Sequence, residues 1–271
     1  MPETPRTADT GGSGDTARTA DGGRPSHAPE FTAGSAGGFT AEYAAAFAAE
    51  AADPHCLAPG DAAALLRGAP WRRFAVVGDS LAEGRGDPVP GYRSASWADR
   101  VAEALREEVP DLAYANLGVR GLTAAQVRAE QAEAAVRFGP DLVCVVCGGN
   151  DLPLPGFSPT VLEKELDLLF SDLSGPGTTL FTYALADVAR AVPALRAGPL
   201  DAGVAVLNEV TRAAAARHGA LVVEMHGHPA TGDRDLYSAD LIHFSARGHA
   251  VAAAVTLRTL SARVRGAERP A

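Results

Sequence analysis

The 271-residue sequence predicts an α/β fold in three layers, with a five-stranded parallel sheet covered by helices on both faces. Three observations lead to this prediction. Short apolar runs alternate along the chain with stretches of helical periodicity. Hydrophobic residues make up 46% of the chain, as in soluble globular proteins. No internal repeat of about 20 to 50 residues, the mark of a repeat architecture, is visible.

The expected strands are short apolar runs bounded by turn residues, the pattern of strands buried in a parallel sheet. The run at 142–147 is the strongest of them. In chain order, the expected strands cover residues 74–77, 112–117, 142–147, 179–183 and 221–225.

The expected helices lie between and after these strands. Trp97, Val101 and Leu105 recur at i, i+4 and i+8 and mark the buried face of one helix. A capping box at Thr123 opens another helix, which extends toward residue 138. Further helices are expected after a cap at Ser158, over 204–216, and from a cap at Ser245 to about residue 264.

The sequence also predicts how the chain is divided: a disordered extension (1–39), a short helical lead-in (40–70), the α/β domain (71–265) and a tail (266–271). No Val, Ile or Leu precedes Leu57, so the extension cannot bury enough apolar surface to offset the entropy lost on ordering. Neither the apolar core of a signal peptide nor an apolar run of about 18 residues is visible. We therefore expect a cytoplasmic protein with no membrane insertion.

Charge and cysteine usage argue against two further classes. The net charge of −9 does not suit a nucleic-acid-binding protein, which would need a basic patch. Three cysteines are too few and too oddly placed for a disulfide framework. Cys144 and Cys147 lie in one predicted strand, where residues three apart point to opposite faces, so we expect buried free thiols. The oligomeric state cannot be predicted from the sequence.

The candidate site begins at Gly78-Asp79-Ser80, directly after the first predicted strand. Ser80 is expected at the carboxyl edge of the sheet, where open α/β folds bind their ligands. A serine hydroxyl is a weak nucleophile at neutral pH and needs a base that is oriented by a third group. Asp240 and His243 lie three apart on a turn, so the carboxylate can bond imidazole Nδ1 and leave Nε2 facing Ser80.

Donors for an oxyanion are expected after the next two strands. Gly118 follows the second strand, and its backbone N–H is open to close approach by a ligand. Asn150 follows the third strand and offers a side-chain amide to the same crevice. Each residue alone has a structural alternative, because Gly118 can serve a tight turn, Asn150 can cap a helix, and Asp240 can cap a turn.

Taken together, these residues resemble the SGNH hydrolases of the GDSL esterase/lipase family over about residues 73–264. The four matching blocks appear in order as Gly78-Asp79-Ser80, Asn116-Leu117-Gly118-Val119-Arg120-Gly121, Gly148-Gly149-Asn150-Asp151 and Asp240-Leu241-Ile242-His243. The resemblance implies that Ser80 is the nucleophile, His243 the general base and Asp240 the orienting acid. It also implies an oxyanion hole made by Ser80 and Gly118 N–H with the Asn150 amide.

The same resemblance implies a flavodoxin-like sheet of order 2-1-3-4-5, with no metal and no cofactor. The expected activity is hydrolysis of a small or medium acyl ester through an acyl-enzyme. An acyltransferase, a thioesterase or a carbohydrate deacetylase would use the same residues, and a catalytically silent binding module would keep the fold.

Five further residues near the predicted edge are candidates for substrate binding. For Asp79, the alternative is a role in holding the turn. His226 and His228 lack the carboxylate or cysteine that a metal site would need beside them. The candidates are Asp79, Glu83, Arg120, His226 and His228.

Overall fold

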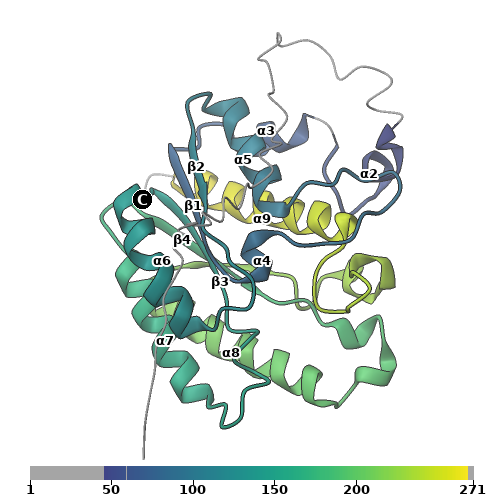
Figure 1. Cartoon of the computed structure of the whole chain (residues 1–271). Helices are drawn as coiled ribbons and strands as arrows, with labels where there is room; N and C mark the ends of the chain where they lie inside the picture. The colour runs from purple at the N-terminus through teal and green to yellow at the C-terminus, as the bar shows by residue number, and fades with distance from the viewer. Residues whose placement is uncertain (1–45, 59, 268–271) are drawn as a thin grey trace, which may run out of the picture. The chain divides into compact units, whose positions relative to one another are not determined.

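The apolar runs form one parallel sheet in the computed structural model, which describes residues 46–58 and 60–267. Within these residues the strand order is β2-β1-β3-β4-β5, and every neighbouring pair is parallel (Figure 1). The predicted fold class and strand order are therefore confirmed. The strands are β1 (Arg73–Gly78), β2 (Ala113–Asn116), β3 (Leu142–Val146), β4 (Thr179–Ala184) and β5 (Leu221–Glu224).

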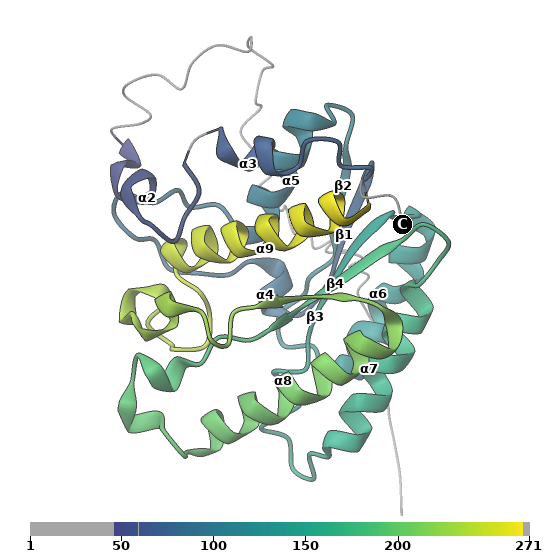
Figure 2. The same ribbon diagram turned by 180° about the vertical axis from the view of Figure 1, so that it is seen from behind.

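Helices cover both faces of the sheet (Figures 1 and 2). One face carries α5 (Trp97–Glu108) and α9 (Ala246–Ala267), and the other carries α6 (Ala124–Phe138), α7 (Pro159–Leu173) and α8 (Pro199–His218). This is the expected three-layer arrangement. None of the helices in the described part of the chain combines the length and the apolar character needed to cross a membrane.

The helix starts agree with the capping signals in the sequence. Thr123 and Gln126 form the predicted capping box of α6, and Ser158 precedes α7 with proline at its first position. Ser245 precedes α9, and its Oγ accepts the Gly248 N–H at 3.2 Å. One start was wrong: α8 begins at Pro199 rather than at 204, because proline is well suited to the first turn of a helix.

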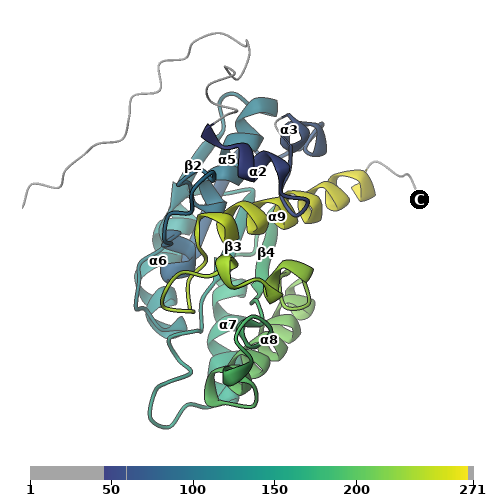
Figure 3. The same ribbon diagram turned by 90° about the vertical axis from the view of Figure 1, so that its right-hand side faces the viewer.

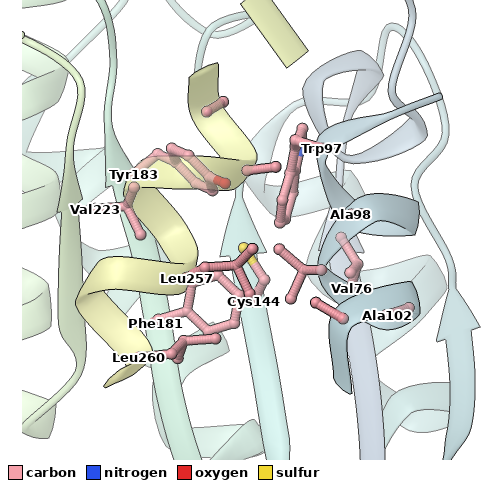
Figure 4. Packing of buried hydrophobic residues seen from close by; sticks show 14 of the residues in the cluster. Val76, Trp97, Ala98, Ala102, Cys144, Phe181, Tyr183, Val223, Leu257 and Leu260 are labelled. Carbon is pink, nitrogen blue, oxygen red and sulfur yellow. The ribbon is translucent and has the colours of Figure 1, made fainter. Parts of the chain in front are cut away.

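The first core lies between the sheet and α5 with α9. Val76, Cys144 and Phe181 point from three strands toward Trp97 and Leu257 on these helices (Figure 4). All five side chains are at most 3% exposed, so this face is a dry aromatic and aliphatic layer. This layer fixes β1 against β3 and thereby fixes the turn at the end of β1.

The second core lies between the sheet and α6, α7 and α8. Val77, Val143 and Val145 contribute from the strands, because alternate strand residues point to opposite faces. Cys147 packs in this second core whereas Cys144 packs in the first, and both thiols are free. The sulfur atoms thus lie on opposite sides of the sheet, as the strand pattern predicts.

Part of the lead-in segment packs on the helical layer of the first core. Its helices α2 (Ala48–Ala52) and α3 (Asp61–Leu65) lie beside α5 and α9 (Figure 3). Arg100 of α5 donates to Glu50 Oε1 at 2.5 Å, and its side chain is only 7% exposed. The predicted extension (1–39) lies outside the described residues, and the predicted domain start at residue 71 stays a prediction.

Candidate active site

Ser80 lies where the chain turns from β1 into α4 (Ser80–Glu83). Gly78 precedes this turn with φ 153°, and a Cβ there would lie 1.9 Å from the Val146 carbonyl oxygen, so only glycine fits. Asp79 caps α4, because its Oδ1 accepts the Leu81 N–H at 3.0 Å. Ser80 itself is half-buried, at the carboxyl edge of the sheet.

His243 joins the nucleophile candidate to the acid candidate. Its Nε2 lies 2.7 Å from Ser80 Oγ, and its Nδ1 lies 2.6 Å from Asp240 Oδ2. The backbone between Asp240 and His243 is sharply turned. Leu241 has φ 62°, and the Ile242 N–H donates to Asp240 Oδ1 at 3.0 Å. These contacts bring together three of the predicted residues, from opposite ends of the α/β domain, in a nucleophile–base–acid order.

The Asp240 carboxyl is held in its ionised form. Burial works to raise its pKa, but hydrogen bonds from the His243 ring and from the N–H groups of Ile242 and His243 lower the pKa to about 2. An ionised Asp240 accepts a hydrogen bond from Nδ1–H, which leaves Nε2 as the acceptor for the Ser80 hydroxyl. The pair therefore selects the imidazole tautomer that a general base needs.

Gly118 lies beside α4 on the loop after β2. A Cβ at this position would lie 2.3 Å from the Glu83 backbone nitrogen, so the loop can approach the turn at Ser80 only with glycine here. The Gly118 N–H donates to Asn116 Oδ1 at 2.9 Å, and Asn116 Nδ2 donates to the Ala82 carbonyl at 2.7 Å. The Gly118 N–H thus has an acceptor within the protein.

Asn150 reaches the turn at Ser80 from the loop after β3. Its Nδ2 donates to the Leu122 carbonyl at 3.0 Å and to Asp79 Oδ2 at 3.4 Å. The second contact is at the long limit for a hydrogen bond and is weak. The Asn150 N–H that contacts Asp79 would therefore be the one to bond a stronger acceptor.

Asp79 lies beneath the site rather than at its surface. Its side chain is 2% exposed, and burial raises the pKa of its carboxyl to about 6, against smaller lowering effects of the Leu81 N–H and of His243. Its oxygens contact Leu81 and Asn150, so Asp79 braces the turn of Ser80 and the Asn150 amide together. These contacts fit the turn-holding alternative better than contact with a substrate.

Glu83 and Arg120 form an ion pair at the side of the Gly118 loop. Arg120 Nη2 donates to Glu83 Oε1 at 2.8 Å, and the Arg120 side chain is 60% exposed. Glu83 Oε2 is buried with no hydrogen-bond partner among the described residues. An ion pair whose arginine lies at the surface contributes little to stability.

The two candidate histidines after β5 have partners outside the Ser80–His243–Asp240 chain. His226 Nδ1 lies 3.3 Å from Asn208 Nδ2. His228 packs edge-on against His55 at 5.2 Å between ring centroids, and burial lowers its pKa. Within residues 46–58 and 60–267, no three His, Cys, Asp or Glu side chains are grouped to hold a metal ion.

Two amides in the site were missed by sequence reasoning. Asn116 holds the Gly118 N–H, and Gln131 of α6 bonds both the N–H and the carbonyl of Gly78 at 2.8 Å. A signal for Gln131 exists, because it shares the buried stripe of α6 with Ala124 and Val127. A polar residue on an apolar stripe indicates a buried hydrogen-bond partner.

Arg247 is a third residue that was missed. It lies in the first turn of α9, and its side chain is 9% exposed. Its guanidinium donates to Asp53 at 2.7 Å, to Asp233 at 2.9 Å and to Asp235 at 2.7 Å. It thereby ties the lead-in segment to the loop that carries Asp240.

Comparison with known proteins places the fold and the family. Residues 76–251 match the family model of the GDSL-like lipase/acylhydrolase family. No match was found among curated proteins. LAE5, an alpha/beta hydrolase enzyme from the metagenome of Lake Arreo, Spain, is 22% identical, with a TM-score of 0.58 over 72% of this chain and 95% of that one.

Two further solved structures are similar. Axe2, an acetylxylan esterase from Geobacillus stearothermophilus, is 20% identical, with a TM-score of 0.56 over 72% of this chain and 94% of that one. The lipase/acylhydrolase from Enterococcus faecalis is 20% identical, with a TM-score of 0.54 over 71% of this chain and 96% of that one. At this level of identity the likeness shows a shared fold.

Proposed function

The chain belongs to the GDSL-like lipase/acylhydrolase family and is a hydrolase of ester bonds, and on this basis we propose that it is a serine esterase acting on small or medium acyl esters. One observation carries the proposal: Ser80 Oγ, the His243 ring and the Asp240 carboxylate form an unbroken chain with contacts of 2.7 and 2.6 Å. This order of nucleophile, base and acid recurs on unrelated folds that transfer acyl groups.

In the acylation step, His243 Nε2 takes the hydroxyl proton as Ser80 Oγ attacks the ester carbonyl carbon. The ionised Asp240 stabilises the imidazolium that forms. When the tetrahedral intermediate collapses, the bond from the carbonyl carbon to the leaving oxygen breaks, and His243 returns the proton to that oxygen. The products of this step are an alcohol and an acyl ester on Ser80.

The oxyanion is held by the N–H groups of Ser80 and Gly118 and by Asn150 Nδ2. In this structure the Gly118 N–H bonds Asn116 Oδ1 at 2.9 Å. One N–H of Asn150 contacts Asp79 Oδ2 weakly at 3.4 Å, while the other bonds the Leu122 carbonyl. The Asn116 bond and the weak Asp79 contact are therefore the ones exchanged for the oxyanion during the reaction. Hydrogen bonds to an ionised oxygen are about twice as strong as those between neutral groups. The exchange is therefore more favourable in the tetrahedral intermediate than in the bound ester and contributes to kcat.

Deacylation repeats the same proton transfers with water as the nucleophile. His243 Nε2 takes a proton from water, the hydroxide attacks the acyl carbon, and the proton returns to Ser80 Oγ as the acid leaves. The half-exposed Asp240 and half-buried Ser80 lie near the surface, so water can approach the acyl group.

The same residues would serve an acyltransferase, a thioesterase or a carbohydrate deacetylase. Axe2 is named as an acetylxylan esterase, so acetylated xylo-oligosaccharides belong in a substrate panel with acyl esters of graded length and acyl thioesters. Product analysis with and without an added alcohol separates transfer from hydrolysis, because only transfer gives a new ester.

Replacement of the proposed nucleophile tests the function. We expect Ser80→Ala to lower kcat for p-nitrophenyl acetate by about 10³-fold or more and to abolish labelling by a fluorophosphonate, because no oxygen remains to attack. Ser171→Ala, an exposed serine on α7, is the control and should keep both activities. Labelling and hydrolysis by Ser80→Ala at the unmodified rate would refute the proposal.

A further inference from the structure

The hydrogen-bond ladder between β1 and β2 is interrupted two residues before Ser80. The register of this pair ends at Val76 and Asn116, whereas β1 continues to Gly78. The chain leaving β2 still donates two N–H groups to β1, from Leu117 to the Val76 carbonyl at 2.8 Å and from Val119 to the Gly78 carbonyl at 3.1 Å. The Gly78 N–H has no strand partner on this side, and a buried N–H without a partner is costly.

Gln131 fills this gap from α6. Its side chain is 4% exposed, its Oε1 accepts the Gly78 N–H at 2.8 Å, and its Nε2 donates to the Gly78 carbonyl at 2.8 Å. The carboxamide thus supplies the acceptor that a neighbouring strand would have offered to the Gly78 N–H, and it adds a second donor to the Gly78 carbonyl. Because Val119 donates to the same carbonyl, Gln131 and the Gly118 loop are held to one peptide.

The other side of this peptide is closed by β3. A Cβ on Gly78 would lie 1.9 Å from the Val146 carbonyl oxygen, and the Asp79 N–H donates to that oxygen at 3.2 Å. Gly78 is therefore clamped between β3 and the Gln131 amide, two residues before Ser80. Removing one side of the clamp leaves room for the turn to shift.

We propose that Gln131 is a positioning residue for catalysis: its amide sets the distance between the Ser80 turn and the Gly118 loop. The inference rests on the proposed function, which assigns nucleophilic and oxyanion roles to these two segments. It adds a residue from a helix that carries none of the candidate catalytic groups. A misplacement of about 1 Å at a reacting group can lower a rate by about 10²-fold.

The chain contains a matched control for this idea. Asn208 of α8 makes the same two-sided contact after β4: its Oδ1 accepts the Leu185 N–H at 2.6 Å, and its Nδ2 donates to the Leu185 carbonyl at 3.0 Å. It is 1% exposed, so the two amides are buried alike. Neither β4 nor Leu185 carries a candidate catalytic group. Asn208 Nδ2 also lies 3.3 Å from Nδ1 of His226, a substrate-binding candidate, so loss of this clamp tests the structural effect on kcat, and a change in KM is assigned to His226.

The experiment compares Gln131→Met with Asn208→Leu, which remove the polar atoms and keep similar volumes. Steady-state kinetics with p-nitrophenyl acetate, the rate of fluorophosphonate labelling and thermal unfolding are measured for both. We expect Gln131→Met to lower kcat and the labelling rate by about 10-fold to 100-fold, with KM changed by less than about threefold. The pH profile should keep its shape, because His243 and Asp240 are untouched. Asn208→Leu should lower the Tm and leave kcat within about twofold.

Two results would overturn the inference: an unchanged kcat in Gln131→Met, or an equal loss of kcat in Asn208→Leu. If Gln131→Met does not fold, Gln131→Glu decides, because it keeps an acceptor for the Gly78 N–H and loses the donor to the Gly78 carbonyl. We then expect a larger loss of kcat than in Asn208→Leu, and unchanged kcat would refute the role. An active Ser80→Ala would instead refute the proposed function, so the two failures are distinguishable.

Discussion

The two arms of the candidate site differ in the partners of their polar groups. In the relay arm, Ser80, His243 and Asp240 bond one another at 2.7 and 2.6 Å. In the oxyanion arm, Gly118 and Asn150 bond acceptors that have no part in the proposed chemistry, an asparagine side chain and a backbone carbonyl. The relay arm is assembled as it would act, whereas the oxyanion arm must exchange partners.

This difference follows from the chemistry of each arm. A relay that is fixed on folding needs no reorganisation when the proton moves, which lowers the barrier. Until an ionised oxygen forms, the donors of an oxyanion hole need other acceptors, because a donor left unsatisfied away from water costs about 1–3 kcal/mol. Acceptors within the protein remove that cost and keep the two loops in place. We therefore expect the arms to respond differently to substitution.

The largest expected effect is loss of the base. His243→Ala should lower kcat by about 10⁴-fold or more, because the group proposed to take the Ser80 proton is removed. His218→Ala is the control, since His218 lies on α8 and bonds Asp167 at 3.1 Å, outside the site. The measurement is kcat with p-nitrophenyl acetate. A loss below about tenfold in His243→Ala would show that the relay arm does not carry the proton transfer.

The next effect comes from the oxyanion arm. Asn150→Ala should lower kcat by about 10²–10³-fold with a small change in KM, because the lost hydrogen bond forms fully only when the carbonyl oxygen is ionised. The pH dependence of kcat/KM should keep its shape, because the base is intact. A loss as large as that of His243→Ala, or a profile of different shape, would contradict the separation of the two arms.

The relay arm could be predicted from the sequence because its chemistry fixes both residue type and spacing. Asp240 and His243 lie three apart on a turn, and Ser80 follows an apolar strand, which favours one edge of the sheet for all three. The four ordered blocks shared with the SGNH hydrolases then assigned them to one site. The five strands could also be predicted, since each is an apolar run bounded by turn residues.

The partners of the oxyanion arm could not be predicted in the same way. Gly118 bonds Asn116, and Asn150 bonds the Leu122 carbonyl. Both contacts depend on loop conformations, which no spacing rule determines. Gln131 was detectable as a polar residue on an apolar helical stripe, but its target Gly78 follows from packing. The Arg247 contact with the lead-in joins residues 194 apart and leaves no local pattern.

Asp79 contacts both arms. Its substitution is expected to change kcat least, and its main effect is on stability. Burial raises the pKa of its carboxyl from the ordinary 3.8 to about 6. Between these values the unfolded chain has lost the proton that the folded chain still binds. Stability that is complete below about pH 4 therefore decreases as pH rises and levels off above about pH 6. A shift of about two pH units corresponds to on the order of 3 kcal/mol.

Asp79→Asn removes this titration and keeps an acceptor for the Leu81 N–H, which holds the turn of Ser80. The Tm of the unmodified protein minus that of the variant should therefore fall between about pH 4 and 7 and stay constant above, because only the unmodified protein must bury a charge there. Thermal unfolding across this range measures the difference, and kcat at neutral pH should change by less than about tenfold. Parallel curves of Tm against pH would mean that the pKa of Asp79 is the same in the folded and unfolded chain, and would contradict the rise in pKa caused by burial.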